Sequence, residues 1–276
     1  MTLSQTAKAE AFRRLHETAG AFILPNAWDA GSAKLLAATG FPALATTSAG
    51  FAYALGRPDA SSALSREENL AALAATAAAV DLPVSADLEA GYGQAPEAAA
   101  ETIRLSAEAG AVGGSIEDVA YTPEPRLLDA DFAAERIAAA AEAARGTGFA
   151  YTLTARCEAF LLGHPDPLAE SVRRLNLFRE AGAHCLYAPG VQDLDSIAVL
   201  AREVAGPLNV VMAVAGAPLS RLEAAGVKRV SVGGCLMRAT LGTLRRAAEE
   251  MRDQGSFGFA ADAIADAELM EFFSRA

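Results

Sequence analysis

The sequence predicts a (β/α)8 barrel, and three observations lead to this fold class. The chain has 276 residues, and barrels of this kind typically have about 250. Short apolar or β-branched runs recur eight times along the chain. Amphipathic or alanine-rich stretches with helical length and period separate these runs. Such an alternation of apolar strands and helices is typical of a parallel sheet that is buried on both faces.

The eight predicted strands are residues 21–25, 42–47, 83–87, 111–116, 149–155, 183–187, 207–212 and 228–232. The clearest predicted helices are residues 66–80, 96–109, 133–145, 167–181 and 194–204. Ser65 and Glu68 form a capping-box pattern, and Asp166 before Pro167 is typical of a helix start. Left-handed helix stops are expected at Gly40, Gly110, Gly182 and Gly226. Local sequence therefore supports the predicted helix boundaries.

The chain is expected to form one domain over residues 1–276, because no low-complexity linker or change of composition divides it. Residues 260–276 are expected to form an extra C-terminal helix after the barrel closes. A glycine-containing hinge over residues 253–259 precedes this helix. Because the helix carries an apolar stripe, we expect it to pack on a neighbouring subunit.

The charge of the chain argues against several classes of partner. Lys and Arg number 23 and Asp and Glu 34, which gives 23 − 34 = −11. Such a charge repels nucleic-acid backbones and anionic lipid headgroups. Residues 1–10 are polar, and no window approaches 18 uncharged apolar residues, so a soluble cytoplasmic protein is expected. An anionic substrate would therefore need a metal ion or a positioned arginine at its site.

Cysteine and histidine patterns argue against disulfide and zinc chemistry. The cysteines are Cys157, Cys185 and Cys235. Their odd number and wide spacing favour reduced, mostly buried thiols over a disulfide framework or a Cys-x-x-Cys site. The histidines are His16, His164 and His184. They lack the spacing of a zinc hydrolase.

Acidic side chains follow three neighbouring predicted strands at the end of the barrel where active sites lie. The charged residues at these strand ends are Asp87, Glu89, Glu117, Asp118, Arg156 and Glu158. They are all expected to converge. The two-residue period of a strand directs Asp87 and Glu89 to the same side. Because adjacent carboxylates repel each other unless they are protonated or bridged by a hard cation, the cluster predicts a magnesium or manganese site.

Each of these residues also has a structural interpretation. Asp87 and Glu89 could be helix-capping and loop acids that face water. Arg156 could form a salt bridge with Glu117 or Glu158 instead of binding a carboxylate or enolate oxygen of the substrate. Both interpretations remain open at this point.

Hydroxyl groups and a further acid extend the candidate site. Thr47 and Ser48 end the second predicted strand, where they could border a substrate carboxylate or phosphonate, or cap a helix. Asp59 could orient metal-bound water or be a simple turn residue. Cys157 and Cys185 lie in apolar strands and are interpreted as packing thiols without a chemical role.

Several ordered motifs resemble those of the isocitrate lyase and phosphoenolpyruvate mutase superfamily over nearly the whole chain. They lie at residues 25–30, 55–59, 87–93, 116–118, 155–160 and 226–233. The motif at 87–93 reads Asp-Leu-Glu-Ala-Gly-Tyr-Gly. Glu89 replaces the second Asp of the usual superfamily motif and lengthens that side chain by one methylene.

This resemblance implies a barrel enzyme that binds Mg2+ and acts on a small 2-oxo or 2-hydroxy carboxylate through an enolate. By the resemblance, the direct metal ligand is Asp87, and the residues that hold the metal's waters are Glu89, Glu117 and Asp59. The implied substrate-contacting residues are Thr47, Ser48 and Arg156. The resemblance also implies a homo-oligomer, in which two subunits exchange a helix to form a dimer and two dimers pair into a tetramer.

The loop after the fourth predicted strand departs from the superfamily pattern. Residues 118–128 contain no Cys, Lys, His or Asn, although the lyases use a loop Cys as an acid or base and the phosphonate enzymes use an Asn. Tyr121 or Arg126 could replace that group, or the loop could be a proline-stiffened cover. The sixth strand end at Tyr187 also lacks the Glu or His of many relatives.

The sequence therefore leaves three hypotheses. The leading one is a Mg2+-dependent lyase that cleaves a C–C bond, with Arg156 and Tyr121 as catalytic residues. The second is a phosphonopyruvate-type mutase or hydrolase that acts on a P–C bond. The third is an inactive barrel that serves in binding or assembly.

Overall fold

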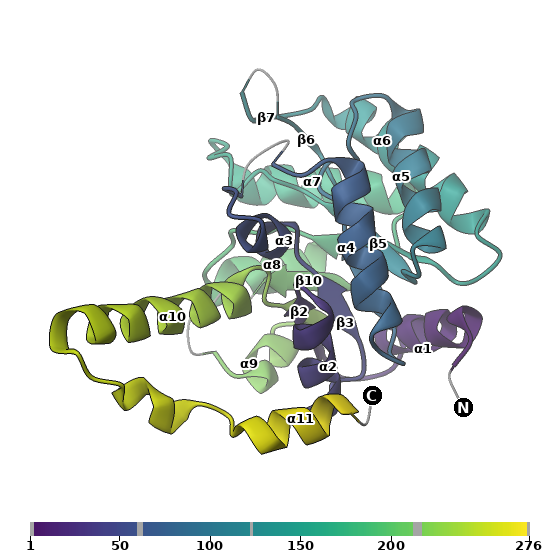
Figure 1. Ribbon diagram of the computed structural model, residues 1–276. Helices are drawn as coiled ribbons and strands as arrows, with labels where there is room; N and C mark the ends of the chain where they lie inside the picture. The colour runs from purple at the N-terminus through teal and green to yellow at the C-terminus, as the bar shows by residue number, and fades with distance from the viewer. Residues whose placement is uncertain (1–2, 60–62, 122–123, 212–216, 275–276) are drawn as a thin grey trace.

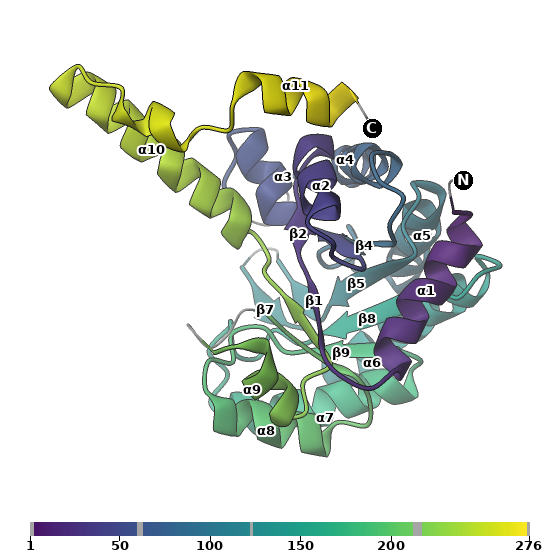
Figure 2. The ribbon, with the colours of Figure 1, turned by 90° about the horizontal axis from the view of Figure 1, so that it is seen from below.

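A closed barrel of parallel strands forms the centre of the molecule (Figures 1 and 2). The computed structural model describes residues 3–59, 63–121, 124–211 and 217–274. The barrel strands are β1 (Phe22–Leu24), β2 (Asn26–Ala27), β3 (Leu44–Thr46), β4 (Val84–Asp87), β5 (Gly113–Glu117), β8 (Thr152–Arg156), β9 (Cys185–Tyr187), β10 (Leu208–Val211) and β11 (Arg229–Ser231). The predicted barrel is confirmed. Met212, part of one predicted strand, lies outside the described residues.

The strand order closes the sheet into a ring. Neighbouring strands follow the order β1-β11-β10-β9-β8-β5-β4-β3-β2, and every pair is parallel. Only Pro25 separates β1 from β2, so these two short strands form one interrupted stave. Because proline lacks a backbone N–H, it interrupts the strand while the chain direction continues. The nine strands thus form eight staves, which match the eight predicted runs.

Helices pack around the barrel and over its ends (Figure 2). They are α1 (Gln5–Glu17), α2 (Ala30–Ala38), α3 (Ser48–Ala54), α4 (Arg66–Ala78), α5 (Pro96–Glu108), α6 (Ala130–Arg145), α7 (Pro167–Glu180), α8 (Leu194–Glu203) and α9 (Leu219–Ala224). The capping box of Ser65 and Glu68 is present, and Asp166 caps α7 before Pro167. The four predicted glycine stops, Gly40, Gly110, Gly182 and Gly226, all have positive φ. The capping residues and glycines in the sequence therefore predicted these helix boundaries correctly.

The C-terminal segment differs from the single helix expected over 260–276. A long helix, α10 (Cys235–Gln254), projects away from the barrel (Figures 1 and 2). It is followed by a short 3-10 helix, η1 (Gly258–Asp262), and by α11 (Asp266–Ser274), while residues 275–276 lie outside the described part. The helix is therefore interrupted between Asp262 and Asp266, inside the segment that was expected to be one continuous helix. Packing of this segment on a second subunit stays a prediction.

The projecting segment leaves apolar side chains in solvent. Met237 is the one buried residue of α10, and no residue of α11 within the described part is buried. Exposed apolar residues of the segment include Leu244, Phe257 and Met270. In the described part of the chain, no helix combines the length and apolar character needed to cross a bilayer.

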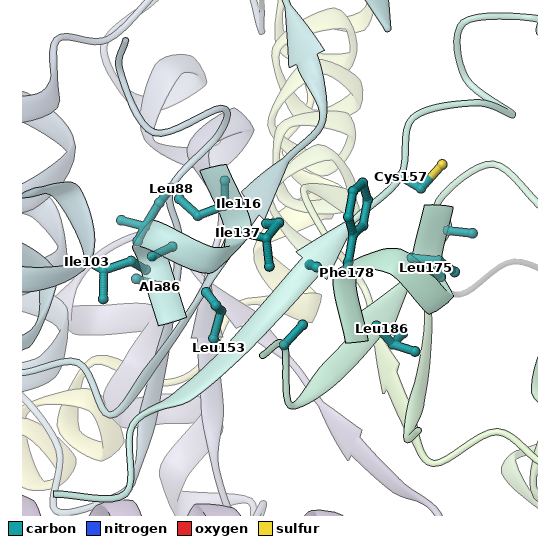
Figure 3. Packing of buried hydrophobic residues seen from close by; sticks show 14 of the residues in the cluster. Ala86, Leu88, Ile103, Ile116, Ile137, Leu153, Cys157, Leu175, Phe178 and Leu186 are labelled. Carbon is teal, nitrogen blue, oxygen red and sulfur yellow. The ribbon is translucent and has the colours of Figure 1, made fainter. Parts of the chain in front are cut away.

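The main core lies between the barrel and the helices around it, and Figure 3 shows the part that packs against α5, α6 and α7. Leu88, Ile116 and Leu153 are fully buried there and pack with Ile103 of α5 and Phe178 of α7. Cys157 and Cys185 are also fully buried, and burial raises the pKa of both thiols. These two cysteines are packing groups, as expected from the sequence.

A polar cluster fills the barrel interior near the N-terminal ends of its strands, next to α1. The buried guanidinium of Arg229 donates to Asn209 Oδ1 at 2.8 Å and to Thr154 Oγ1 at 3.0 Å. Its Nη1 lies 3.2 Å from His16 Nε2, and His16 Nδ1 lies 2.9 Å from the carbonyl oxygen of Phe12. Since Arg229 can only donate, His16 is neutral and carries its proton on Nδ1. Burial, followed by the charge of Arg229, lowers the pKa of His16 to about 3.

We expect His16 to make the stability of the fold depend on pH. Its pKa is lower in the folded protein than the ordinary value of about 6.5, so its contribution is complete above that value and is lost as pH falls. At pH 5 the loss should be about 2 kcal/mol. Urea unfolding should therefore show that the stability advantage of the wild type over His16→Gln shrinks by this amount between pH 7.5 and 5.

The matched control is Leu73→Ala, which removes a buried apolar side chain from α4. Its cost, about 2–5 kcal/mol, should be the same at both pH values. An advantage over His16→Gln that does not change between the two pH values would contradict the neutral, buried state of His16.

Candidate active site

The C-terminal ends of the barrel strands surround a cavity of ≈ 550 Å³. This is the end of the barrel at which the sequence placed the site. The acidic side chains that line it are Asp59, Asp87, Glu89, Glu117 and Glu158, and the basic ones are Arg156 and Arg238. The cavity thus gathers an excess of negative charge into a partly enclosed space.

Asp87, at the end of β4, is held by one oxygen and leaves the other free. Its Oδ2 accepts hydrogen bonds from the backbone N and the Oγ of Ser48, both at 2.9 Å. Its backbone is fixed by Thr46 Oγ1 and by Asn69 Nδ2. Oδ1 is buried and has no hydrogen-bond partner among the described residues. A buried carboxylate oxygen without a partner is costly unless a ligand satisfies it.

Glu89 shares the cavity with Asp87, as expected, but it does so from the turn after β4 and not through the two-residue period of the strand. The turn places Glu89 at φ 48° and Tyr92 at φ 55°, a left-handed conformation that is uncommon for residues other than glycine. Burial raises the pKa of Glu89 to about 7, and the negative charges of Asp87 and Asp59 add to the shift. Glu89 therefore holds its charge poorly unless a cation is close.

Arg156, at the end of β8, lies between two glutamates. Its Nη1 is 2.9 Å from Glu117 Oε1, and its Nε donates to Glu158 Oε1. Burial raises the pKa of Glu117, and the charge of Arg156 opposes this effect. The Tyr187 ring also lies beside the guanidinium, with 5.3 Å from the Arg156 Cζ to the ring centroid. Both of the salt bridges considered from the sequence are therefore formed, and they fix Arg156 at the cavity wall.

Asp118 does not join the cluster, which corrects the expectation that all five strand-end acids converge. It follows Glu117 directly, so it faces the opposite side of the strand. Its Oδ1 accepts from the backbone N of Glu158 at 2.8 Å, and its Oδ2 pairs with the buried Arg174 at 3.2 Å. Asp118 thus fixes the end of β8 from behind the cavity wall.

A small hairpin brings Tyr121 to the cavity. Strands β6 (Val119–Ala120) and β7 (Arg126–Leu127) pair antiparallel directly after β5. Tyr121 lines the cavity, and its hydroxyl donates to Glu117 Oε2. Arg126 lies exposed on β7 and does not line the cavity. Of the two candidates that the sequence offered for this loop, the hairpin places Tyr121 beside the acids.

Thr47, Ser48 and Asp59 all line the cavity, but with different contacts. Thr47 caps α3, because its Oγ1 accepts from the backbone N of Gly50 at 3.2 Å. Ser48 donates to Asp87, as described above. Asp59 lies on an exposed loop, and partial burial followed by the charge of Asp87 raises its pKa. The helix-capping interpretation of Thr47 is therefore correct, while its hydroxyl still borders the cavity.

The arrangement suits a hard cation that keeps part of its water shell. In the ranges that the structure describes, no three His, Cys, Asp or Glu side chains converge closely enough to hold a metal by themselves. One free carboxylate oxygen on Asp87, with further carboxylates at the cavity wall, is the donor set that Mg2+ accepts when it retains several waters. The residues present therefore fit Mg2+ better than a metal that needs a closed protein cage.

The structure adds residues that the sequence analysis did not place. Cys235 and Arg238, at the start of α10, line the cavity, together with Tyr53 and Gln192. Cys235 is partly exposed, whereas Cys157 and Cys185 are buried, so the thiols are mostly buried as expected. The preceding Gly233 and Gly234 directly follow the eighth predicted strand, residues 228–232. Inspection of that strand end, as was done for the third to fifth, would have found these residues.

A buried arginine connects the backbone segments that carry Glu89 and Glu117. Arg136 of α6 is 1% exposed and makes no ion pair among the described residues. Its Nη1 donates to the carbonyl oxygen of Glu117 at 3.1 Å, and its Nη2 donates to those of Ala90 and Gly93. The end of β5 and the turn that carries Glu89 are therefore held by one guanidinium.

Comparison with known proteins gives a consistent family assignment. The family model described as phosphoenolpyruvate phosphomutase matches residues 12–252. A curated relative from Mycobacterium tuberculosis, described as an uncharacterized protein, is 33% identical over 88% of this chain and 89% of its own. A crystal structure from Burkholderia cenocepacia J2315, described as a "putative lyase/mutase", is 53% identical with a TM-score of 0.92 and covers 98% of this chain and 96% of that one.

Two more distant structures carry named activities. A 2,3-dimethylmalate lyase is 25% identical with a TM-score of 0.84, and the alignment covers 97% of this chain and 93% of that one. A phosphonopyruvate hydrolase in complex with oxalate and Mg2+ is 25% identical with a TM-score of 0.86, and the alignment covers 97% and 95%. A lyase and a hydrolase therefore both occur among structures similar to this one.

We expect Arg136→Met to lower the free energy of unfolding by about 2–4 kcal/mol, because it leaves buried carbonyl oxygens without donors. Urea denaturation measures this loss. The matched control is Arg173→Gln on α7, which removes an ion pair with Glu170 whose arginine side chain is 52% exposed. The control should lose about 1 kcal/mol or less. Equal losses in the two variants would contradict the role of Arg136.

Proposed function

The chain belongs to the phosphoenolpyruvate phosphomutase family, and from this premise we propose that it is a Mg2+-dependent lyase. It cleaves a C–C bond in a small 2-oxo or 2-hydroxy carboxylate through an enolate. The observation that carries the proposal is the free, buried Oδ1 of Asp87 in a cavity walled by further carboxylates and Arg156. The similarity to a 2,3-dimethylmalate lyase and to a Mg2+ complex of a phosphonopyruvate hydrolase supports it.

Asp87 would bind Mg2+ directly, and Glu89, Glu117 and Asp59 would hold its waters. When bound, Mg2+ supplies Lewis acidity that stabilises negative charge on the oxygen atoms of an enolate. It would also restore a favourable environment for ionised Glu89, whose pKa burial raises. Asp59, Asp87, Glu89 and Glu117 would repel one another and an anionic substrate. The positive charge of Mg2+ would compensate this repulsion.

Arg156 would bind the substrate with the part of its guanidinium that the protein leaves free. Nε and Nη1 are engaged by Glu158 and Glu117, while Nη2 makes no hydrogen bond to the described residues. This group would donate to a carboxylate or enolate oxygen. Because Glu117 and Glu158 fix the orientation of the Arg156 guanidinium, the side chain needs little reorganisation as negative charge develops on the substrate. Ser48 and Thr47 would border the same oxygen atoms.

Tyr121 is the proposed proton donor. Burial, followed by the charge of Glu117, raises the pKa of its hydroxyl, which therefore stays protonated. The hydrogen bond to Glu117 orients the hydroxyl at the cavity. Cleavage of a 2-hydroxy acid removes one proton from the hydroxyl and adds one to the enolate carbon. Glu117, whose pKa burial raises, would accept the first proton, and Tyr121 would deliver the second. Transfer of the proton from Glu117 to Tyr121 along their hydrogen bond would then restore both groups. Tyr121 would thus replace the loop cysteine of other family lyases.

A phosphonopyruvate-type mutase or hydrolase is the second candidate. The similarity to the phosphonopyruvate hydrolase favours it, with an identity equal to that of the 2,3-dimethylmalate lyase. Both reactions need the same stabilised enolate, so the acids and Arg156 do not discriminate between them. Phosphorus-31 NMR of the protein with phosphonopyruvate separates the candidates, because a P–C enzyme converts the signal and a C–C lyase does not.

We expect the protein to bind oxalate, an analogue of the pyruvate enolate, only when Mg2+ is present. Isothermal calorimetry should show that Asp87→Asn abolishes this binding, because the variant loses the direct metal ligand. The matched control is Asp195→Asn, which changes an exposed acid of α8 outside the cavity and should bind as the wild type does. Oxalate binding that is independent of Mg2+, or undisturbed in Asp87→Asn, would contradict the proposal.

Tyr121→Phe should lower kcat by about 100-fold or more, the usual effect of losing a general acid, while Mg2+ and oxalate affinities stay within about twofold. Arg126→Gln, a change on the exposed strand of the same hairpin, should leave kcat unchanged. Steady-state kinetics on a panel of 2-oxo and 2-hydroxy acids provides the measurement. Unchanged turnover in Tyr121→Phe would remove Tyr121 from the reaction.

A further inference from the structure

Four basic side chains gather at the N-terminal ends of β8 and β9, at the opposite end of the barrel from the acidic cavity. We propose that they bind the phosphate group of a small anionic ligand. The residues come from α1, α6, α7 and the position before β9, and they are Arg13, Arg145, Arg179 and His184. None of them lines the acidic cavity, so the site is independent of the proposed function.

Hydrogen bonds to the start of β8 place Arg13 at this end of the barrel. Its Nη2 donates to the carbonyl oxygen of Tyr151 at 2.8 Å, and its Nε donates to Thr152 Oγ1 at 3.4 Å. Figure 2 shows α1 beside the start of β8. Nη1 of Arg13 makes no hydrogen bond to the described residues. Part of this guanidinium therefore remains available to a ligand.

Arg179 and Arg145 approach the same end from the last turns of α7 and α6. Arg179 Nη1 donates to the carbonyl oxygen of Ala183 at 2.7 Å. Arg145 lies next to Gly182, because a Cβ atom on this glycine would be 3.5 Å from Arg145 Nη1. The Arg145 side chain is exposed and makes no hydrogen bond or ion pair with the described residues. Both guanidinium groups thus flank the two residues that lead into His184.

His184 adds a neutral hydrogen-bond donor to the three arginines. Its Nδ1 accepts a hydrogen bond from the backbone N of Leu153 at 3.2 Å, so Nε2 carries the proton. This Nε2 makes no hydrogen bond to the part of the chain that the structure describes. Burial, followed by the charges of Arg13, Arg179 and Arg145, lowers the pKa of His184 to about 4. The three guanidinium groups therefore lie close enough to the ring to disfavour a second proton.

The positive charge of this cluster is not balanced by carboxylates. Within the described ranges, no Asp or Glu forms an ion pair with Arg13, Arg145 or Arg179, and the remaining residues contain no Asp or Glu. Burial lowers the pKa of Arg13, the charge of the exposed Glu17 opposes this shift, and the charge of Arg179 adds to it. Crowded cations in a chain of net charge −11 indicate a place that an anion occupies.

Helix capping explains only part of this arrangement. The dipole of a helix places about −0.5 charge at its C-terminus, so α6 and α7 together offset about one of the three guanidinium charges. The rest of the charge and the unused donors remain. A phosphate group supplies about −1.5 to −2 charges and three acceptor oxygens. It suits donors that come from three helices better than a carboxylate does, because a carboxylate has only two oxygens in one plane.

The experiment measures the binding of inorganic phosphate by isothermal calorimetry, in chloride buffers of matched ionic strength. Arg145→Gln should weaken phosphate binding about 10-fold or more, the effect of losing a charge-assisted hydrogen bond. Arg145→Lys should recover part of the affinity. Because Arg145 is exposed, circular dichroism should show that both variants fold as the wild type does. Arg179→Gln should weaken phosphate binding as well, which tests the site from a second helix.

Two further variants are the matched controls. Arg173→Gln removes an equal charge from an exposed position on α7, and Arg238→Gln removes one from the acidic cavity. Both should bind phosphate as the wild type does. The proposal is overturned by a wild type that does not bind phosphate, by equal weakening in Arg145→Gln and Arg173→Gln, or by a loss that occurs only in Arg238→Gln.

Two other ligands identify the source and the class of the anion. Adenosine monophosphate that binds in an Arg145-dependent way would show that the phosphate belongs to a larger molecule. Binding of inorganic phosphate without binding of adenosine monophosphate would instead indicate free phosphate, and either result supports the site. Malonate, a dicarboxylate, should bind more weakly than both. Tighter binding of malonate would overturn the assignment of the site to phosphate.

Discussion

The site depends on one electrostatic constraint, the crowding of carboxylates at the carboxyl ends of β4, β5 and β8. Like charges held together at a partly enclosed surface are stable only when protons or positive charges balance them. Arg156 balances Glu117 and Glu158 through two ion pairs. It does not balance Asp87 and Glu89, which keep a free buried oxygen and a raised pKa respectively. This unbalanced part of the cluster is the basis for proposing that the cavity binds a divalent cation.

The surrounding protein holds the acids in place with groups that do not neutralise them. Arg136 binds backbone carbonyl oxygens beneath Glu89 and Glu117, and Ser48 binds one oxygen of Asp87. Behind the cavity wall, the buried pair of Asp118 and Arg174 fixes the end of β8. Such supports keep the donors preorganised, so that a cation and an anionic substrate meet a site that does not need to rearrange.

Several residues that line the cavity lie in loops and helix starts outside the barrel strands. The β6–β7 hairpin brings the Tyr121 hydroxyl to Glu117. The first turn of α10 adds Cys235 and Arg238 to the cavity lining. A barrel can change the chemistry and the substrate in this way because its strands fix the cluster while its loops vary independently.

The sequence by itself determined the barrel, its eight staves, most helix ends and the strand ends at which the acids lie. These features are local, since they depend on the alternation of apolar runs, on caps such as Ser65 and on glycine stops. Only the tertiary structure decided that Asp118 pairs with Arg174 behind the cavity wall, that Thr47 caps a helix, and that the C-terminal segment divides into α10, η1 and α11. It also brought Arg238 and Glu117, residues more than one hundred positions apart in the chain, to the lining of one cavity. Side-chain direction beyond the end of a strand no longer follows a fixed period, and closure of the ring joins segments that no local pattern connects.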